Sequence, residues 1–229
     1  MSTLPHPLAG ARVLIAGASG GLGAALAHEC FARGAERLAL AGRDERRLSD
    51  LSLPGTRHPG DLREPGACEA LVAEAADAWG GLDVVINASG VVAFGAAADL
   101  PATALEELFA LNTLAAIRLA RAAAGAVAPG GAIVTISGVI AEGNVAGMAA
   151  YGASKAAVHA FAQAFAREAR RAKVRVLDAR PPHTETGLAG RTIAGIAPDL
   201  GEGRAPAAVA RRICDALEAG ERDLPSTAF

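Results

Sequence analysis

The chain has 229 residues, of which 52% are hydrophobic and 20% are charged, and its formal net charge at pH 7 is −2. This composition is typical of a packed globular protein with one large domain, and it excludes a disordered or fibrous chain. The small net charge gives no support to nucleic acid or an anionic membrane as a partner. No apolar stretch approaches the ~20 residues that span a bilayer, and Cys30, Cys68 and Cys214 lack metal-ligand spacing. We therefore expect a cytoplasmic protein without a metal site.

Short apolar runs alternate with alanine-rich stretches along nearly the whole chain. The expected strands are residues 12–16, 37–41, 82–87, 132–137 and 174–179, and a polar run at 56–58 is a further candidate. The expected helices are residues 22–33, 64–79, 102–126, 149–172 and 207–219. Apolar strands that alternate with helices are typical of right-handed βαβ units in a sheet buried on both faces. The sequence therefore predicts an α/β fold with a doubly wound parallel sheet, a Rossmann-type three-layer sandwich in a single domain of residues 1–229.

A glycine-rich segment joins the first expected strand to the first expected helix. It reads Gly17-Ala-Ser-Gly-Gly21-Leu-Gly23. Glycines let the backbone turn sharply and come close to a pyrophosphate. The N-terminus of the helix adds unpaired N–H groups and the positive end of its dipole. The segment therefore predicts a dinucleotide site, although a tight turn without a ligand would use the same glycines.

Five motifs, in order along the chain, resemble those of the short-chain dehydrogenase/reductase family. The matches are Ala16-Gly17-Ala-Ser-Gly-Gly21-Leu-Gly23 for TGxxxGxG, Asp61-Leu62 for the acidic pair beside the adenine ring, Asn87-Ala-Ser-Gly90 for NNAG, the helical Asn112, and Tyr151-Gly-Ala-Ser-Lys155 for YxxxK. In the first motif, Ala16 replaces the threonine of the family. The resemblance implies a nicotinamide dinucleotide as cofactor. By the same resemblance, this cofactor contacts Gly17, Ser19, Gly20, Gly21, Leu22, Gly23, Asp61, Leu62, Asn87, Ala88, Gly90, Tyr151 and Lys155.

The end of the second strand bears on which dinucleotide is bound. A site specific for NAD would place an acidic residue where this chain has Gly42, because a carboxylate binds the ribose 2′-hydroxyl. Glycine offers no side chain, whereas the planar guanidinium of Arg43 can pair with a 2′-phosphate. We therefore expect NADP(H) to be preferred over NAD(H). The alternative is that Arg43 only begins the solvated charged run 43–47.

Tyr151, the single tyrosine of the chain, lies four residues before Lys155 on an expected helix, so the two share one face. A free tyrosine has a pKa of ~10 and is a poor base at neutral pH. An ammonium ~4 Å away, at an effective dielectric near 20, is worth about 4 kcal/mol, which would lower this pKa to ~7. The pair therefore predicts Tyr151 as the general acid/base, with Lys155 lowering its pKa and binding the ribose hydroxyls. An ordinary pair on a helix surface is the alternative.

One departure from the family pattern concerns the serine that polarises the substrate oxygen. The family places it thirteen residues before the tyrosine, and that position is Gly138 here. Ser137 is adjacent, but neighbouring side chains of a strand point to opposite faces, so its hydroxyl faces away from the substrate if the strand stays regular. A positive φ or a bulge at Gly138 would re-aim it. Asn144 and His183 are other candidate donors, and the loss of one such donor costs about 10²–10³ in rate.

A second departure follows the last core strand, where the family pattern PGxxxT reads Pro181-Pro182-His-Thr-Glu-Thr186. Proline fixes φ and lacks an N–H donor, so this wall of the site is stiffer. By resemblance, the backbone of Thr184 holds the nicotinamide carboxamide and Thr186 reaches cofactor oxygens. The glycine- and proline-rich stretch 181–206 is the expected substrate lid. Its large apolar residues, which predict a modest apolar cover, are Leu188, Ile193, Ile196 and Leu200.

The predicted function is the NADP(H)-dependent interconversion of a carbonyl and an alcohol on a small organic substrate. Tyr151 transfers the proton and Lys155 tunes it. The resemblance implies that Asn112 orders a water relay, and Ser137, if it turns inward, polarises the substrate oxygen.

Two alternatives stay open. The first is a catalytically weakened NADP-binding regulatory protein, which Gly138 and Pro182 favour. The second is a non-redox member of the family, such as a dehydratase, isomerase or cyclase. The resemblance also implies a homodimer or homotetramer, assembled through the helices that carry Asn112 and Tyr151.

Overall fold

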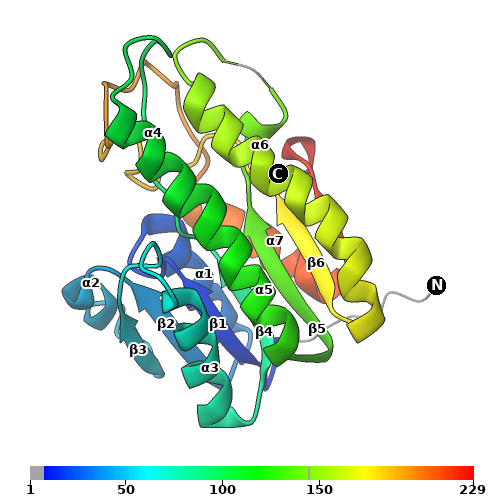
Figure 1. Ribbon diagram of the computed structural model, residues 1–229. Helices are drawn as coiled ribbons and strands as arrows, with labels where there is room; N and C mark the ends of the chain where they lie inside the picture. The colour runs from blue at the N-terminus through cyan, green and yellow to red at the C-terminus, as the bar shows by residue number, and fades with distance from the viewer. Residues whose placement is uncertain (1–7, 144) are drawn as a thin grey trace.

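The computed structural model describes residues 8–143 and 145–229. At their centre is a sheet of seven strands in the order β3-β2-β1-β4-β5-β6-β7, and each neighbouring pair is parallel (Figure 1). The strands are β1 (Arg12–Ala16), β2 (Arg37–Gly42), β3 (Thr56–Pro59), β4 (Leu82–Asn87), β5 (Val127–Ile136), β6 (Arg175–Ala179) and β7 (Asp223–Leu224). The α-helices are α1 (Gly21–Ala32), α2 (Glu45–Ser49), α3 (Ala67–Trp79), α4 (Ala102–Leu108), α5 (Ala116–Ala126), α6 (Ala149–Glu168) and α7 (Pro206–Ala219). A π-helical segment η1 (Phe109–Ala115) joins α4 to α5, and the 3₁₀ turns are η2 (Val139–Ala141), η3 (Ala169–Ala172) and η4 (Ser226–Ala228).

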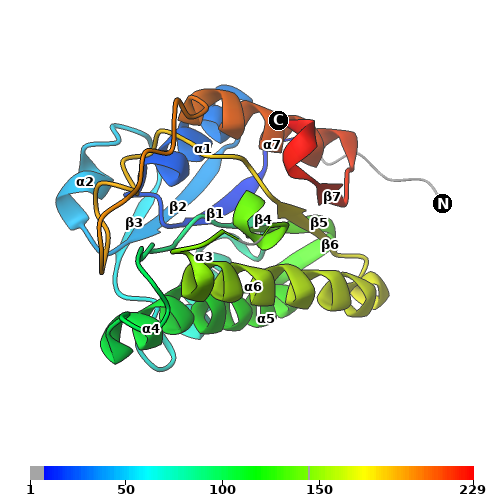
Figure 2. The same cartoon turned by 90° about the horizontal axis from the view of Figure 1, so that it is seen from above.

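Helices cover both faces of the sheet and make three layers (Figure 2). Helices α1 and α7 pack together on one face, and α3, α5 and α6 lie on the other. Neighbouring residues of a strand serve different cores: Leu14 and Ile15 are both fully buried, but in the cores on opposite faces. This is why the central strands read as unbroken apolar runs. The predicted doubly wound three-layer sandwich is confirmed.

The direction in which strands are added reverses between β1 and β4. Strands β2 and β3 lie to one side of β1, and β4 to β7 lie to the other. The loops at the carboxyl ends of β1 and β4 therefore diverge, and doubly wound sheets bind their ligands in that crevice. Ala16 ends β1 and Asn87 ends β4, and these two residues are paired in register. The glycine segment and segment 87–90 thus start side by side.

The differences from the expected elements have local causes. The polar candidate strand is confirmed as β3, but α2 was not expected. Asp44 starts α2, because its side chain accepts a hydrogen bond from Arg47 N at 3.1 Å. β5 begins five residues before the expected 132, where Pro129 and the two glycines that follow it interrupt the apolar pattern and the pairing with β4 is irregular. In the described part of the chain, no helix is long and apolar enough to cross a membrane.

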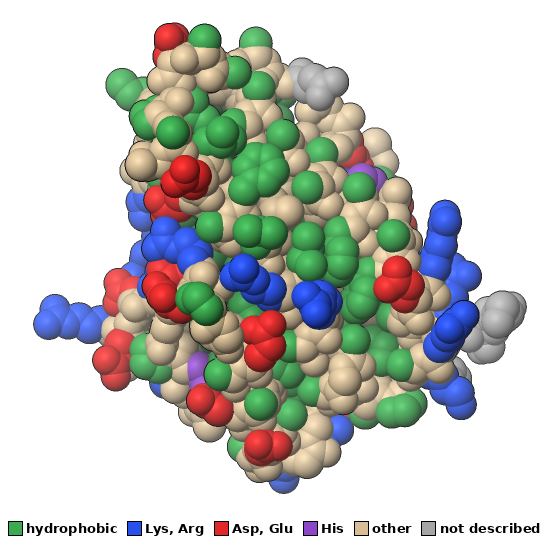
Figure 3. All heavy atoms as spheres, viewed as in Figure 1, with side chains coloured by type: hydrophobic (Ala, Val, Ile, Leu, Met, Phe, Trp, Pro, Cys, Tyr) green, Lys and Arg blue, Asp and Glu red, His purple; other side chains and the backbone are tan. Residues whose placement is uncertain are grey.

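Apolar side chains are spread over the face formed by α4, α5 and α6 (Figure 3). Leu105 in α4 is 44% exposed and Leu114 in η1 is 48% exposed. A second subunit against this face stays a prediction.

Candidate active site

In the glycine segment after β1, other backbone atoms come so close to Gly17 and Gly23 that neither position has room for a side chain. Gly17 has a φ of 84°, and a Cβ there would lie 2.6 Å from the backbone N of Ser89. A Cβ at Gly23 would lie 2.1 Å from the carbonyl oxygen of Gly17. Helix α1 starts at Gly21, and its N-cap Gly20 has no side chain to bind the N–H groups of the first turn. This backbone fits the approach of a pyrophosphate.

At the end of β2, a side chain on the last residue would meet the hydroxyl of Ser19. A Cβ at Gly42 would lie 2.4 Å from Ser19 Oγ, so a carboxylate at this position would displace Ser19. The carboxylate of Asp44 is already used as the cap of α2. Arg43 is exposed between them. The features that suggested a 2′-phosphate site are thus compatible with the geometry, although ligand contact at Arg43 stays a prediction.

Asp61 is paired within the protein, in the turn that follows β3. Arg63 donates to both of its carboxylate oxygens, with Nε 3.0 Å from each, and to Glu107 at 2.7 Å. The hydrogen bond from Arg63 holds the pKa of Asp61 below its ordinary value, and the charge of Arg43 adds to this. Leu62 is buried. These residues follow β3, which is the edge strand on the side of the sheet opposite β5 and β6.

Asn87 shapes the loop after β4. Its Oδ1 accepts hydrogen bonds from Ser89 N at 3.1 Å and from Ser89 Oγ at 2.6 Å. Asn87 itself is 7% exposed, whereas Ala88, Ser89 and Gly90 line a cavity. Asn87 therefore positions a wall of the cavity and does not line it.

Asn112 lies in the π-helical segment η1 and ties three parts of the site together. Its Oδ1 accepts from Val91 N at 2.9 Å, and its Nδ2 donates to Val91 O at 3.0 Å and to Ser154 Oγ at 3.1 Å. A Cβ at Gly90 would lie 3.2 Å from Asn112 Oδ1 and 3.5 Å from Lys155 Nζ. The loop after β4, η1 and α6 therefore meet at Gly90. Single-turn π segments are frequent at functional sites, but a water relay at Asn112 stays a prediction.

Tyr151 and Lys155 lie on successive turns of α6 and line the same cavity. Lys155 is 8% exposed, and its Nζ donates to the carbonyl oxygen of Ile136 at 2.8 Å. Burial lowers the pKa of Lys155 to about 8, which the negative charge of Asp178 opposes. Burial also raises the pKa of Tyr151 to about 12. The expected lowering of the tyrosine pKa does not appear in the protein alone, where removal of the phenol from water is the cause of the shift.

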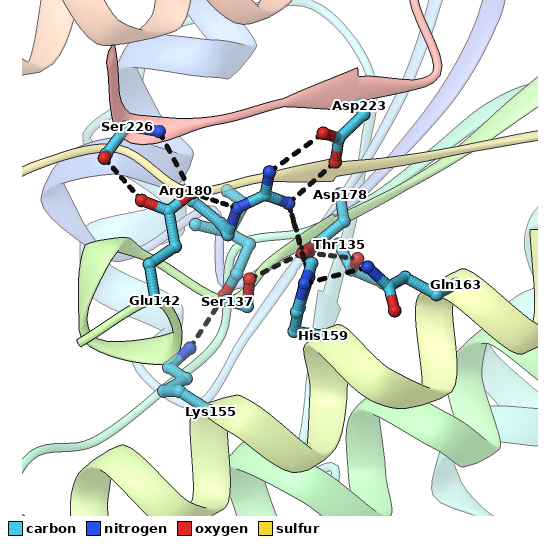
Figure 4. Close-up of polar contacts among 11 residues, drawn as sticks. Thr135, Ser137, Glu142, Lys155, His159, Gln163, Asp178, Arg180, Asp223 and Ser226 are labelled. Atoms are coloured by element: carbon cyan, nitrogen blue, oxygen red, sulfur yellow. Dashed lines mark hydrogen bonds and ion pairs between the residues drawn. The ribbon is translucent and has the colours of Figure 1, made fainter. Parts of the chain in front are cut away.

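Of the two possibilities for Ser137, the structure shows the regular strand, and the hydroxyl is not re-aimed towards the substrate side. Ser137 is fully buried, and its hydroxyl donates to Asp178 Oδ2 at 2.7 Å (Figure 4). Gly138 does have a positive φ, of 80°, but this turns the chain after Ser137 and leaves the serine in strand alternation with Thr135. Both hydroxyls therefore bind the same carboxylate on the α6 side of the sheet.

The other two candidate donors are Asn144 and His183. Asn144 lies outside the described residues. His183 lines the cavity, and its Nε2 lies 3.3 Å from Glu185 Oε1. Glu185 Oε1 also accepts a hydrogen bond from Gly203 N at 2.8 Å, so this pair fastens one part of the segment 181–206 to another.

The segment after β6 folds back over the glycine segment. A Cβ at Gly21 would lie 2.7 Å from the carbonyl oxygen of Thr186. Thr184 Oγ1 donates to Pro182 O at 2.8 Å, and Thr186 Oγ1 accepts from Leu188 N at 3.3 Å. Both threonines line the cavity. This segment thus forms one wall of the cavity, and its hydroxyls are engaged in local turns. Contacts of Thr184 and Thr186 with a cofactor stay a prediction.

The cavity between these elements has a volume of about 360 Å³. It extends from the glycine segment (Gly20 to Leu22) past the loop after β4 to Tyr151 and Lys155. It does not reach Arg43, Asp61 or Leu62. Its apolar wall is formed by Val92, Phe94, Val139, Ile140, Val145, Met148, Leu188 and Leu200. Of the expected apolar residues of the lid, Ile196 is 91% exposed and Ile193 packs against the core, so neither lines the cavity.

Sequence reasoning missed the polar cluster behind this cavity. Figure 4 shows it between β5, β6 and α6, centred on Asp178 and Arg180. Asp178 is 4% exposed and accepts hydrogen bonds from His159 Nδ1 at 2.7 Å and from the hydroxyls of Thr135 and Ser137. A signal was present, because His159 follows Lys155 by the four residues that put both on one helix face.

Known proteins share both the sequence pattern and the fold. A family model described as short chain dehydrogenase matches residues 11–196. The short chain dehydrogenase/reductase AacuN of Aspergillus aculeatus is 30% identical over 82% of this chain and 74% of its own length. The crystal structure of a short chain dehydrogenase from Burkholderia cenocepacia J2315 in complex with NADP superposes with a TM-score of 0.83, at 26% identity, over 96% of this chain and 98% of that one. A short-chain dehydrogenase from Sphingobium yanoikuyae in complex with NADPH gives a TM-score of 0.79 at 30% identity, over 93% and 86% of the two chains.

Proposed function

The chain belongs to the short-chain dehydrogenase/reductase family of oxidoreductases, and on that premise we propose that it reduces a small apolar carbonyl compound with NADPH, or oxidises the corresponding alcohol with NADP⁺. One observation carries the proposal: Tyr151 and Lys155 line the same cavity as the glycine segment that opens α1. A proton donor and a dinucleotide cradle thus face one cavity, which is what hydride transfer to a carbonyl requires.

The protonation state of Tyr151 suits the reductive direction. With a pKa raised by burial to about 12, its phenol keeps its proton at neutral pH. When bound, a reduced nicotinamide supplies a hydride to the carbonyl carbon. Tyr151 Oη gives its proton to the carbonyl oxygen, which becomes the hydroxyl of the alcohol. The Lys155 ammonium stabilises the phenolate that this leaves, until a proton from water restores the phenol.

The size and lining of the cavity support a small apolar substrate. About 360 Å³ is near the lower end of the range for ligand sites. Val139 and Ile140 of η2 and Met148 before α6 contribute apolar walls close to Tyr151 in the chain. The segment 181–206 closes the other side and acts as the lid in this proposal. Its proline at 182 and its hydrogen bonds to the chain around Arg204 favour a stiff cover.

NADP(H) is the proposed cofactor, because Gly42 has no carboxylate to bind a ribose 2′-hydroxyl, and a side chain there would have to displace the Ser19 hydroxyl. The Burkholderia and Sphingobium proteins, which are similar in fold, were solved with NADP and NADPH. Replacement of Arg43 by alanine should weaken NADPH binding about tenfold, which is the worth of one charge-assisted hydrogen bond, and leave NADH binding unchanged. Calorimetric titration of both nucleotides measures this, and an equal loss for both would refute a role at the 2′-phosphate.

The reaction itself is tested with Tyr151→Phe and a panel of small ketones and aldehydes. Absorbance of NADPH should fall with the wild-type protein, and the rate should drop by about 10²–10⁴ in the variant while nucleotide affinity is kept. Undiminished turnover in Tyr151→Phe would refute the role of the phenol. Nucleotide binding without turnover on any substrate would favour the alternative of a regulatory NADP-binding protein, which the engaged hydroxyl of Ser137 supports.

A further inference from the structure

Lys155 depends for its position on one backbone carbonyl at the end of β5. Within the residues that the structure describes, its ammonium donates to the carbonyl oxygen of Ile136 at 2.8 Å. That carbonyl lies between Thr135 and Ser137, and the side chains of both residues form hydrogen bonds with Asp178. Thr135 Oγ1 donates to Asp178 Oδ1 at 2.8 Å, and Ser137 Oγ donates to Asp178 Oδ2 at 2.7 Å. The peptide that Lys155 binds is therefore held on both sides by one carboxylate.

The carboxylate of Asp178 is itself rigidly placed. Asp178 pairs in register with Thr135 across β5 and β6 and is 4% exposed. On the α6 side, His159 Nδ1 donates to Asp178 Oδ2 at 2.7 Å, and Gln163 Nε2 lies 3.1 Å from the other ring nitrogen. Arg180 Nη1 completes the shell at 3.2 Å. Polar networks in which each member is satisfied are rigid.

The charges around Asp178 leave an excess of negative charge beside Lys155. Arg180 is the one guanidinium of the cluster drawn in Figure 4, and it also binds Glu142 and the two oxygens of Asp223, at 2.8 and 3.0 Å. Three carboxylates therefore share one positive charge, with His159 as the remaining titratable group. On its own helix, Lys155 faces Tyr151, and from η1 the neutral amide of Asn112 lies nearby. Asp178 is the anion whose field acts directly on the buried ammonium.

We propose that Asp178 is a positioning residue of the active site, which fixes the Ile136 carbonyl that Lys155 binds and supplies the buried negative charge that keeps the Lys155 ammonium protonated. Its importance for turnover rests on the proposed function. Its effect on the lysine does not, and can be measured in the protein without any substrate. In this arrangement the hydroxyl of Ser137 serves the positioning of Lys155 through Asp178, although the residue itself borders the cavity.

The chain contains two lysines, Lys155 and Lys173, which makes a direct measurement possible. Full-length protein labelled with ¹³C at lysine Cε gives two resonances, and Lys173→Arg assigns them. A pH titration of the wild type should show the Lys155 resonance changing near pH 8, because burial lowers the pKa of Lys155 to about 8. Asp178→Asn should lower this pKa further, by about one unit, since a nearby opposite charge is lost.

Asp223→Asn is the matched control. It removes a carboxylate from the same arginine, but on the outside of the cluster, where the side chain of Asp223 is 60% exposed. It should shift the Lys155 titration by no more than a few tenths of a unit. An unshifted Lys155 in Asp178→Asn, or an equal shift in Asp223→Asn, would overturn the proposal even if Asp178→Asn unfolds at a lower temperature.

A milder variant covers the case in which Asp178→Asn does not fold. Thr135→Val removes one hydrogen bond from the carboxylate and keeps its charge, so the Lys155 pKa should rise by a few tenths of a unit; an unchanged or lowered value counts against the proposal. Activity is the second measurement. The fall of kcat at alkaline pH should move about one unit lower in Asp178→Asn with KM retained. Expected lysine shifts without any turnover would refute the proposed function and leave the role of Asp178 standing.

Discussion

Helix α6 carries two groups of polar side chains that meet very different surroundings. Tyr151 and Lys155, on its first turns, face the cavity, and burial shifts the pKa of each towards its neutral form, to about 12 and about 8. On the following turns, His159 forms a hydrogen bond with Asp178 and Gln163 forms one with His159, in a cluster that reaches Arg180. Both groups lie on one helix face because they are spaced by four residues.

The contrast shows how the protein divides two tasks along one helix. A buried ammonium with few partners costs stability, and such groups are found where chemistry requires them. A saturated cluster holds its members in a single arrangement. The cluster at His159 therefore provides the fixed frame against which the less satisfied pair at Tyr151 is held. Substitutions in the cavity should therefore change mainly activity, and substitutions in the cluster at Asp178 should change mainly stability.

Of the substitutions at Lys155, Gly138 and Ser137, Lys155→Met should have the largest effect on activity. We expect kcat/KM to fall by about 10²–10³, because the phenolate of Tyr151 loses its stabilising charge. We also expect the free energy of unfolding at pH 7 to rise by about 3 kcal/mol, since the folded protein no longer holds a cation whose pKa is lowered to about 8 from 10.5. Denaturant unfolding measures the second effect.

The pH dependence of that gain distinguishes its cause. Unfolded wild type keeps the Lys155 proton up to pH ~10.5, whereas the folded protein loses it near pH 8, so folding becomes more favourable as pH rises across this window. The difference in stability between Lys155→Met and wild type should therefore shrink from pH 8 to pH 10.5. Lys173→Met, the matched control at an exposed lysine, should show neither the gain nor the pH dependence. A constant gain across this range would mean that packing, not charge, is responsible.

Gly138 tests whether the cavity lacks a second donor. A Cβ at Gly138 would meet open space, with Pro181 O at 3.9 Å, but the φ of 80° is unfavourable for any other residue. Gly138→Ala and Gly138→Ser should therefore both lose about 1–2 kcal/mol of stability. Against that shared strain, Gly138→Ser should have a kcat/KM about tenfold above Gly138→Ala, because its hydroxyl can polarise the substrate oxygen. Equal rates in the two variants would mean that another donor already serves.

The fold was predictable from the sequence because its strands are buried on both faces. Apolar runs such as residues 12–16 and 82–87 match β1 and β4 to the residue. Two elements were not predictable from the sequence, because one is very short and the other depends on a single contact. β7 has two residues, and α2 depends on the cap at Asp44. The π-helical η1 also left no pattern, because one extra residue per turn does not change the alanine-rich composition of that stretch.

The site was predictable where one backbone shape or one helix spacing determines it. The glycine segment and the pair Tyr151–Lys155 share a cavity as expected. The direction of the Tyr151 pKa shift was not predictable, because a four-residue spacing does not reveal how far the phenol is removed from water. The partner of Ser137 was also hidden, since Asp178 is 41 residues away and joins it only through the register of β5 and β6.

Ser137→Ala gives the smallest expected change in rate and the sharpest distinction between the two sides of Ile136. If the hydroxyl polarised the substrate, its loss would cost about 10²–10³ in kcat/KM. Since it donates to Asp178 instead, we expect no more than about a threefold loss of kcat/KM. The free energy of unfolding should fall by about 1 kcal/mol, because a buried carboxylate loses a donor. Thr135→Val, which removes the donor to the other oxygen of the same carboxylate, should cost a similar amount. A hundredfold loss of rate in Ser137→Ala but not in Thr135→Val would mean that the Ser137 hydroxyl acts on the substrate. The division of polar side chains between the cavity and the cluster at Asp178 would then be wrong.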